Sequence, residues 1–213
     1  MTETVAVIDY GMGNLHSAGK ALEKEARADQ RIVISADPDV IAAADRVVFP
    51  GVGAIRDCIQ ALSSSGMDQA IHGVIQRGTP LLGICVGMQA LMAHSEENGG
   101  IDALGVFDGK VQFFGHQTAD NGARLKVPHM GWNQVSQRPH FLWQNIDDYS
   151  RFYFVHSYCV TGLDDQQVIG GCEYGVPFAA AVGRDNVVAV QFHPEKSATA
   201  GLALLHNFLR WQP

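Results

Sequence analysis

The sequence predicts one α/β domain over residues 1–213, a three-layer sandwich in which helices flank a mostly parallel sheet that gains antiparallel strands late in the chain. Two observations carry this prediction. In the first half, short apolar strands without polar alternation are separated by helical patterns, which is typical of parallel strands buried on both faces. In the second half, strand-like runs follow one another with few helices between them. The 213 residues, 46% of them hydrophobic, suffice for one sizeable core, and no repeat or linker divides the chain.

The first half alternates the two kinds of element in a regular order. Asp37 suits a helix N-cap and Pro38 suits the first helical position, so a helix is expected to begin there. Pro50 and Gly51 close the third strand. We expect strands over residues 4–9, 31–35, 46–49 and 80–84, and helices over residues 15–26, 38–43, 54–62 and 67–76.

The second half is expected to consist mainly of strands. Residues 183–186, Gly-Arg-Asp-Asn, lie between two apolar runs and predict a hairpin turn. The chain ends in an expected helix over residues 198–211, with one apolar face formed by Leu202, Leu205, Phe208 and Leu209. The expected strands cover residues 106–114, 126–135, 152–160, 168–173 and 178–192.

Composition excludes several classes of function. The net charge is −7 and no Lys/Arg cluster could follow phosphates, so no nucleic-acid partner is expected. No apolar run approaches the roughly 18–20 residues that span a bilayer, and the start of the chain lacks a basic signal-peptide region, so we expect no membrane association. None of the four cysteines forms a C-x-x-C pair, which favours a reducing cytoplasm. The nine histidines lack ligand spacing, and we expect no metal and no cofactor.

The most informative segment is Leu-Leu-Gly-Ile-Cys-Val-Gly-Met-Gln at residues 81–89. Cys85 follows an apolar strand and has a glycine two positions away on either side, which is the pattern of a nucleophile elbow. The sharp turn from strand to helix crowds the positions of Gly83 and Gly87, where a larger residue would clash. A cysteine at a helix N-terminus also favours its thiolate form, the form that attacks carbonyl carbon.

His193 is the best candidate for the base that Cys85 needs. It follows an expected strand, and open α/β sheets place their sites at the carboxyl ends of strands. Pro194 restricts His193 to extended backbone, in which Glu195, two residues on, would point the same way. Glu195 could then hold the imidazole in one tautomer. The expected catalytic residues are Cys85 as nucleophile, His193 as general base and then acid, and Glu195 as its orienting partner.

A glycine-flanked loop, Pro-Gly-Val-Gly at residues 50–53, follows another strand. Acyl transfer needs backbone N–H groups directed at the developing oxyanion, and such a loop can turn an amide toward a neighbouring site at little steric cost. We expect the oxyanion donors to be the amides of Val52 or Gly53, together with that of Val86.

These three segments together resemble the class I, triad-type glutamine amidotransferases. Four further segments resemble the glutaminase subunits of imidazole glycerol phosphate synthase, and the matches span nearly the whole chain. They are Ile-Asp-Tyr-Gly-Met-Gly-Asn-Leu at 8–15, Val-Pro-His-Met-Gly-Trp-Asn at 127–133, Tyr-Phe-Val-His-Ser-Tyr at 153–158 and Gln-Phe-His-Pro-Glu-Lys-Ser at 191–197.

The resemblance implies a function. Glutamine would be hydrolysed through a thioester on Cys85, and the ammonia would pass to a separate (β/α)₈-barrel cyclase subunit in a heterodimer. That subunit makes imidazole glycerol phosphate and an aminoimidazole carboxamide ribotide in histidine biosynthesis. The implied glutamine pocket contains Gly51, Gly53, Val86, Gln89, Ser157 and Tyr158. The implied partner interface contains Gly11, Gly13, Asn14, His129, Met130, Trp132, Asn133 and Lys196.

Other interpretations remain open on the sequence. The chain could feed a different synthase, one that makes anthranilate, aminodeoxychorismate or pyridoxal phosphate, or it could be a non-catalytic regulatory subunit on the same fold. The G-x-G at residues 11–13 lacks the third glycine of a dinucleotide site, since position 16 is His16. We interpret Cys58, Cys159 and Cys172 as core residues, and the acidic pair at residues 96–97 as a solvated loop.

Overall fold

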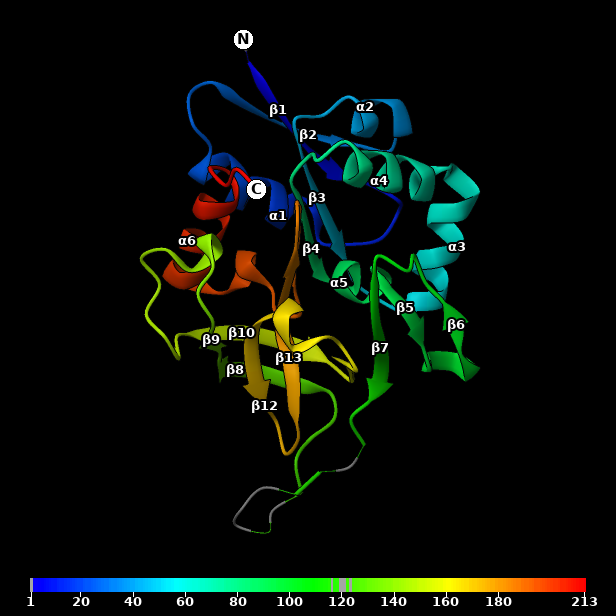
Figure 1. Ribbon diagram of the computed structural model, residues 1–213, viewed down its shortest axis with the longest axis vertical. Helices are drawn as coiled ribbons and strands as arrows, with labels where there is room; N and C mark the ends of the chain where they lie inside the picture. The colour runs from blue at the N-terminus through cyan, green and yellow to red at the C-terminus, as the bar shows by residue number, and fades with distance from the viewer. Residues whose placement is uncertain (1, 116, 119–121, 123) are drawn as a thin grey trace.

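The structure, a computed structural model, describes residues 2–115, 117–118, 122 and 124–213. Parallel strands form one side of its main sheet, starting from the edge strand (Figure 1). Nearly every residue of the three strands nearest the site is buried, as expected for strands covered on both faces. The order of the parallel strands is β2 (Gln30–Ser35), β1 (Glu3–Ile8), β3 (Arg46–Gly51), β4 (Leu81–Cys85) and β14 (Val187–Val190).

Helices cover both faces of these strands and complete the three layers. Helices α1 (Leu15–Glu25) and α6 (Ala198–Phe208) pack together on one side. Helices α2 (Pro38–Ala42), α3 (Ile55–Ser65) and α4 (Met67–Gln76) lie on the other side (Figure 1). The predicted α/β sandwich is therefore confirmed.

Local signals in the sequence set several helix boundaries. The Asp37 side chain accepts a hydrogen bond from the Asp39 amide at 2.9 Å, and Pro38 begins α2, as predicted. Helix α3 ends at Gly66, whose φ of 74° is in the left-handed region that glycine adopts without strain. Short 3₁₀ turns lie at Glu97–Gly99, Phe141–Trp143, Asp165–Gln167 and Pro194–Lys196.

Strands that pair mostly antiparallel extend the sheet beyond β14, as the second half of the sequence predicts. The first is β13 (Pro177–Arg184), which pairs with β14 across the predicted hairpin turn. β12 (Val168–Glu173) pairs with β13 and with the short β9 (Ser136–Gln137). The sheet continues from β13 through β11 (Tyr158–Thr161), β7 (Phe107–Phe113), β5 (Met92–Ser95) and β6 (Ile101–Asp102).

One expected strand proves to be two. The prediction of a continuous strand over residues 152–160 is wrong, because the chain leaves one sheet and enters another at Ser157. β10 (Arg151–His156) pairs with β8 (His129–Gln134) in a separate antiparallel ribbon, whereas β11 belongs to the main sheet. The apolar pattern runs across the break and hides it. The short β5, β6 and β9 were also not predicted, since two to four residues carry no periodic signal.

Three of the cysteines are core residues, as expected. Cys58, Cys159 and Cys172 are at most 7% exposed and form no disulfide. Burial raises the pKa of their thiols to about 12, about 11 and about 12, so at neutral pH they pack as small apolar side chains. Among the described residues, no helix combines the length and hydropathy needed to cross a bilayer.

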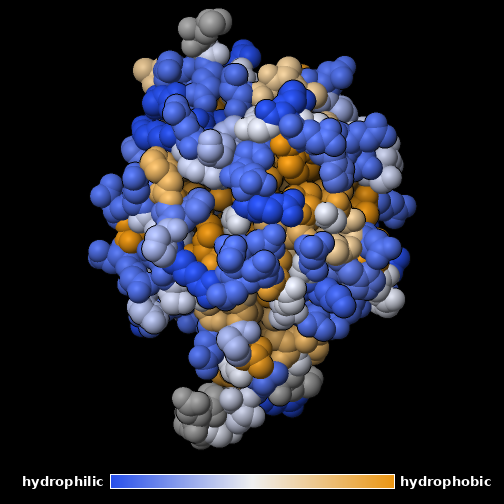
Figure 2. Space-filling model, viewed as in Figure 1, coloured by the Kyte–Doolittle hydropathy of each residue, from blue (hydrophilic) through white to orange (hydrophobic). Residues whose placement is uncertain are grey.

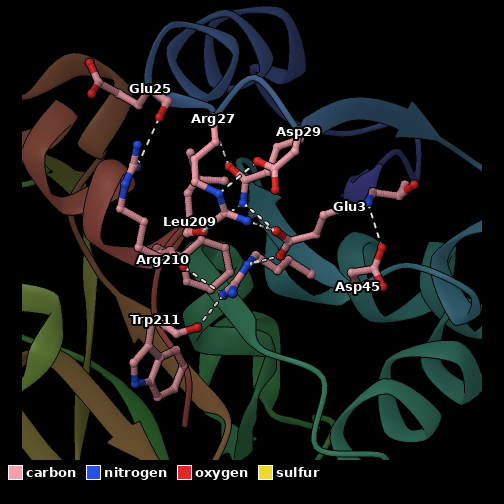
Figure 3. A network of polar contacts seen from close by, with 12 residues as sticks. Glu3, Glu25, Arg27, Asp29, Asp45, Leu209, Arg210 and Trp211 are labelled. Atoms are coloured by element: carbon pink, nitrogen blue, oxygen red, sulfur yellow. Dashed lines mark hydrogen bonds and ion pairs between the residues drawn. The ribbon is translucent and has the colours of Figure 1, made fainter. Parts of the chain in front are cut away.

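A charged network ties the end of the chain to the first strands (Figure 3). Arg46 is 6% exposed; its Nε donates to Glu3 Oε1 at 2.5 Å. Its Nη1 donates to the carbonyls of Phe208 at 3.0 Å and Trp211 at 2.6 Å, just at the end of α6. Arg27 also pairs with Glu3 and donates to the Leu209 carbonyl at 3.0 Å. The guanidinium groups thus satisfy carbonyls that the helix end leaves free.

We expect Arg46→Ala to lower the free energy of unfolding by about 3 kcal/mol, because it removes a buried charged donor from Glu3 Oε1 and from the Phe208 and Trp211 carbonyls. Urea denaturation monitored by circular dichroism would measure the loss. Arg138→Ala is the matched control, since Arg138 pairs with Asp165 at 2.7 Å on the open surface. The free energy of unfolding should fall much less in Arg138→Ala than in Arg46→Ala. Equal losses would show that burial of the Arg46 network contributes nothing.

Candidate active site

Cys85 lies at a strained turn between β4 and the one-turn helix α5 (Val86–Ala90). Its φ of 56° and ψ of −109° are unusual for a residue with a Cβ. This strain directs the side chain away from the strand in the manner of a nucleophile elbow.

The flanking glycines are required by close contacts. A Cβ on Gly87 would lie 2.0 Å from the carbonyl oxygen of Phe49, which belongs to the neighbouring strand β3. A Cβ on Gly83 would lie 2.9 Å from Leu91 Cδ1 and 3.0 Å from Ala189 Cβ. A side chain at position 87 would therefore collide with backbone, and one at position 83 would have to displace Leu91 or Ala189. The crowding expected at both glycines is confirmed.

His193 reaches the same place from the end of β14. Its amide donates to the Tyr153 carbonyl at 2.9 Å, and its own carbonyl accepts from Ser197 Oγ at 2.6 Å. Its Nδ1 lies 2.9 Å from Glu195 Oε1, and the two side chains are 2% and 4% exposed. The expected pairing is present, but an extended backbone does not produce it. Residues Pro194–Lys196 form a 3₁₀ turn that brings Glu195 back to the ring.

The surroundings of His193 favour its protonated form. Burial alone would lower the pKa of the imidazole, but the neighbouring Cys85 and Glu195 outweigh burial and raise it to about 9. With Nδ1 directed at Glu195, the other ring nitrogen remains for Cys85. Within the described chain, Nε2 has no partner that meets hydrogen-bond geometry, although the sulfur is near enough to raise the pKa. The arrangement suits an imidazolium beside a sulfur anion.

A cavity of about 270 Å³ opens at Cys85 and His193. It gathers most of the predicted site residues from four separate parts of the chain. Those that line it are Val52, Gly53, Cys85, Val86, Gln89, Ser157, Tyr158 and His193. Four lining residues were not predicted: Glu97, Pro128, Val155 and His156.

Gly51 does not line this cavity. A Cβ there would lie 2.5 Å from the Tyr10 hydroxyl and 2.9 Å from the Gly87 amide nitrogen. Gly51 therefore lets the end of β3 approach the elbow, and the structure places it behind the pocket instead of in it.

Two residues near the nucleophile were not predicted from the sequence. Gln191 is fully buried, and its Nε2 lies 3.7 Å from Cys85 Sγ. The sequence did offer a signal for Gln191, because a polar glutamine stands at the end of an apolar run, two residues before His193. Glu97 is half-buried, contrary to the expectation of a solvated loop. Its Oε2 accepts a hydrogen bond from the Ile55 amide at 3.0 Å, a contact across 42 residues that no local pattern indicates.

The expected interface residues separate into exposed and buried groups. Met130 and Trp132 are 63% and 50% exposed on one face of the β8–β10 ribbon, and Lys196 is exposed next to Glu195. His129 is only 3% exposed and stacks on Tyr174 inside the protein, because alternate residues of β8 point to opposite faces.

The remaining expected interface residues are exposed or half-buried; these are Gly11, Gly13, Asn14 and Asn133. Figure 2 shows apolar residues reaching the surface in the lower half of the view, over the antiparallel strands. No group of three or more His, Cys, Asp or Glu within the described residues is placed to hold a metal ion.

The fold and the elbow define a class of protein. A family model for class-I glutamine amidotransferases matches residues 6–211, so the chain belongs to that family. A chain in the solved structure of PurLQS from Thermotoga maritima shares the fold, with a TM-score of 0.69 and 18% identity over 99% of this chain and 99% of that chain.

More similar relatives narrow the class to one subunit type. The HisH subunit of imidazole glycerol phosphate synthase from Dechloromonas aromatica is 58% identical over 99% of this chain and 98% of that protein. The subunit HisH 1 of the same synthase from Pseudomonas aeruginosa is 57% identical over 99% of this chain and 98% of its own length. Within the family, these relatives place the chain with the HisH subunits.

Proposed function

We propose that this chain hydrolyses glutamine to glutamate and ammonia at Cys85 and supplies the ammonia to the cyclase subunit of imidazole glycerol phosphate synthase, in histidine biosynthesis. The observation that carries the chemistry is the meeting of Cys85 and His193 in one cavity, with Glu195 2.9 Å behind the imidazole. Full-length similarity to HisH subunits favours this synthase over those that make anthranilate, aminodeoxychorismate or pyridoxal phosphate.

The geometry supports a two-step reaction. The Cys85 thiolate attacks the side-chain carbonyl carbon of glutamine, and the amide of Val52 or Gly53, together with that of Val86, would stabilise the oxyanion; all three residues line the cavity. His193 gives its proton to the leaving nitrogen, so ammonia departs and a thioester remains. The neutral imidazole then takes a proton from water, which attacks the thioester and releases glutamate and the thiolate.

The cavity also contains groups suited to the amino-acid end of glutamine. Glu97 lines the cavity, and its carboxylate would pair with the substrate's α-ammonium group. Gln89, Ser157 and Tyr158 offer polar groups on the other walls. A carboxylate at one end and the nucleophile at the other would fix both the direction and the length of the substrate.

The β8–β10 ribbon is the proposed site for the cyclase. Its exposed Met130 and Trp132 share a strand pair with Val155, which lines the cavity. Free ammonia in water is mostly ammonium at neutral pH and is not nucleophilic, so a junction that excludes water favours transfer. A cytoplasmic setting suits the free cysteines and the biosynthetic role of the relatives.

The test is the glutaminase rate of the purified chain alone, with the cyclase, and with the cyclase and its nucleotide ligand. We expect slow hydrolysis alone and a large rise in the liganded complex, because wasteful release of ammonia is avoided if the amides at residues 50–53 align only then. No glutamine hydrolysis in any of the three conditions would overturn the proposal and favour a regulatory subunit. Equal rates throughout would overturn the coupling to the cyclase.

We also expect glutaminase kcat/KM to fall as pH rises through about 9, the pKa of His193, because a neutral imidazole cannot protonate the leaving ammonia. The same proton affects stability. The folded pKa lies above the unfolded value of 6.5, so this contribution is complete below pH 6.5 and is lost as pH rises through about 9. Rate profiles and urea midpoints from pH 6 to 10 would check both, and Glu195→Gln should move the kinetic midpoint downward.

A further inference from the structure

A buried glutamine contacts the proposed nucleophile and takes no part in the two-step reaction. Gln191 is 0% exposed, and its backbone is held by a 2.9 Å hydrogen bond from its amide to the Ala180 carbonyl. Its side-chain Nε2 lies 3.7 Å from Cys85 Sγ, and its Oε1 accepts from Gln89 Nε2 at 3.0 Å. Gln191 therefore links the sulfur to a wall of the substrate cavity.

The orientation of this amide follows from a backbone carbonyl, which can only accept hydrogen bonds. Gln89 Nε2 lies 3.2 Å from the carbonyl oxygen of Tyr158, so the amino group of Gln89 must face in that direction. The same amino group donates to Gln191, which must present its oxygen there. Gln191 consequently turns its own N–H toward the sulfur.

Two buried histidines extend the same logic. His156 Nδ1 lies 2.8 Å from the Tyr158 carbonyl and so carries the proton, which leaves Nε2 as an acceptor. His129 Nδ1, at 2.9 Å, donates to it. The remaining nitrogen of His129 accepts from Asn133 Nδ2 at 3.4 Å. Burial lowers the pKa of His156 to about 3 and that of His129 to about 4, so both rings are neutral at pH 7.

We propose that Gln191 is a positioning residue for the reaction at Cys85, donating a hydrogen bond to the sulfur in an orientation set by Gln89. The Tyr158 carbonyl, which also accepts from His156, holds Gln89 in turn. The role deepens the proposed glutaminase function and rests on it. A donor aimed at sulfur stabilises the thiolate and holds it ready for the substrate, separately from the imidazole.

Alkylation of Cys85 by iodoacetamide at pH 7 tests the hydrogen bond without needing turnover. Peptide mass spectrometry would measure the alkylation of Cys85 separately from that of the other three cysteines. We expect Gln191→Met, which keeps the volume and removes the donor, to slow alkylation about tenfold, the value of one hydrogen bond to a charged group. Gln191→Glu keeps the shape and also lacks the N–H, so it should slow alkylation as well.

A matched control separates this role from a merely structural one. Asn207 is another buried amide, 4% exposed, whose Nδ2 donates to the carbonyls of Leu142 at 2.9 Å and Gln144 at 2.7 Å. Asn207→Leu should lower the unfolding midpoint and leave alkylation unchanged.

In the complex with the cyclase, we expect Gln191→Met to lower glutaminase kcat by about tenfold and to raise KM less, because the cavity wall survives. Wild-type alkylation rates in folded Gln191→Met or Gln191→Glu would overturn the proposal. If Gln191→Met fails to fold, Gln191→Glu decides. If the wild-type complex hydrolyses no glutamine, the proposed function fails, whereas alkylation still reports on the contact between Gln191 and Cys85.

Discussion

Cys85→Ala should abolish glutamine-dependent synthesis by the complex with the cyclase while leaving ammonia-dependent synthesis intact. The substitution removes the sulfur that forms the thioester, and loss of a nucleophile in comparable triads lowers kcat by on the order of 10⁴-fold or more. Alanine fits the elbow, since it only shortens a side chain that points into the cavity. Steady-state rates with glutamine and with ammonium salts at a pH that supplies free ammonia would measure both activities.

Cys172→Ala is the control for that experiment. Cys172 lies on β12 at 7% exposure and lines none of the active-site cavity. The Cys172→Ala variant should keep both activities and lose only some stability, as expected for a shortened core side chain. If Cys85→Ala lowered the two activities equally, Cys85 would be a structural residue and the proposed thioester would be wrong.

The second large effect is expected at His193. His193→Asn should lower glutamine-dependent kcat by on the order of 10⁴-fold, because it removes the imidazole that is proposed to give a proton to the leaving nitrogen. The fold loss of glutamine-dependent kcat in Glu195→Gln should be at least about tenfold smaller, since Glu195 orients the ring without transferring the proton. Its side chain is 4% exposed and contacts Nδ1 directly, so some loss is still expected.

A second histidine–carboxylate pair serves as the control. His206 Nδ1 lies 3.3 Å from Glu25 Oε2, between α6 and α1 and away from the cavity. His206→Asn should retain full activity with glutamine and with ammonia as the nitrogen source. Equal losses of kcat in His193→Asn and Glu195→Gln would contradict the assigned division of roles. Because triad members act non-additively, the double variant would then be needed to measure how much of the loss the two residues share.

The elements that were predicted correctly share one property, namely that their signal is local. Asp37 and Pro38 mark a helix start within two residues, and the hairpin turn before β14 lies between the two strands that it joins. The elbow is similar. Gly83, Cys85 and Gly87 are close in the chain, so their pattern can be read locally, although the clashes that demand glycine involve Phe49 and Ala189 on neighbouring strands.

The errors arose where spatial neighbours are distant in the chain. The pattern over residues 152–160 could not reveal that β10 and β11 belong to different sheets, because both halves bury apolar residues equally well. The resemblance implied that Gly51 belongs to the glutamine pocket, whereas the cavity lining does not include it and a Cβ there would meet Tyr10 and Gly87. His129 was expected at the interface, but its position in β8 turns the ring inward.

From its residues alone, the chain specifies an α/β sandwich, a cysteine at a glycine-flanked turn and a histidine–glutamate pair after a late strand, since each is marked by a residue pattern that lies within a short segment. Tertiary structure alone decided that Glu97 and His156 line the cavity and that Gln191 faces the sulfur. Those contacts depend on strand register and on turns that bring together distant segments, for example Ile55 with Glu97, 42 residues apart, and Gln191 with Cys85, 106 residues apart. Local patterns carry no information about such distances, because register is set by packing of the whole core.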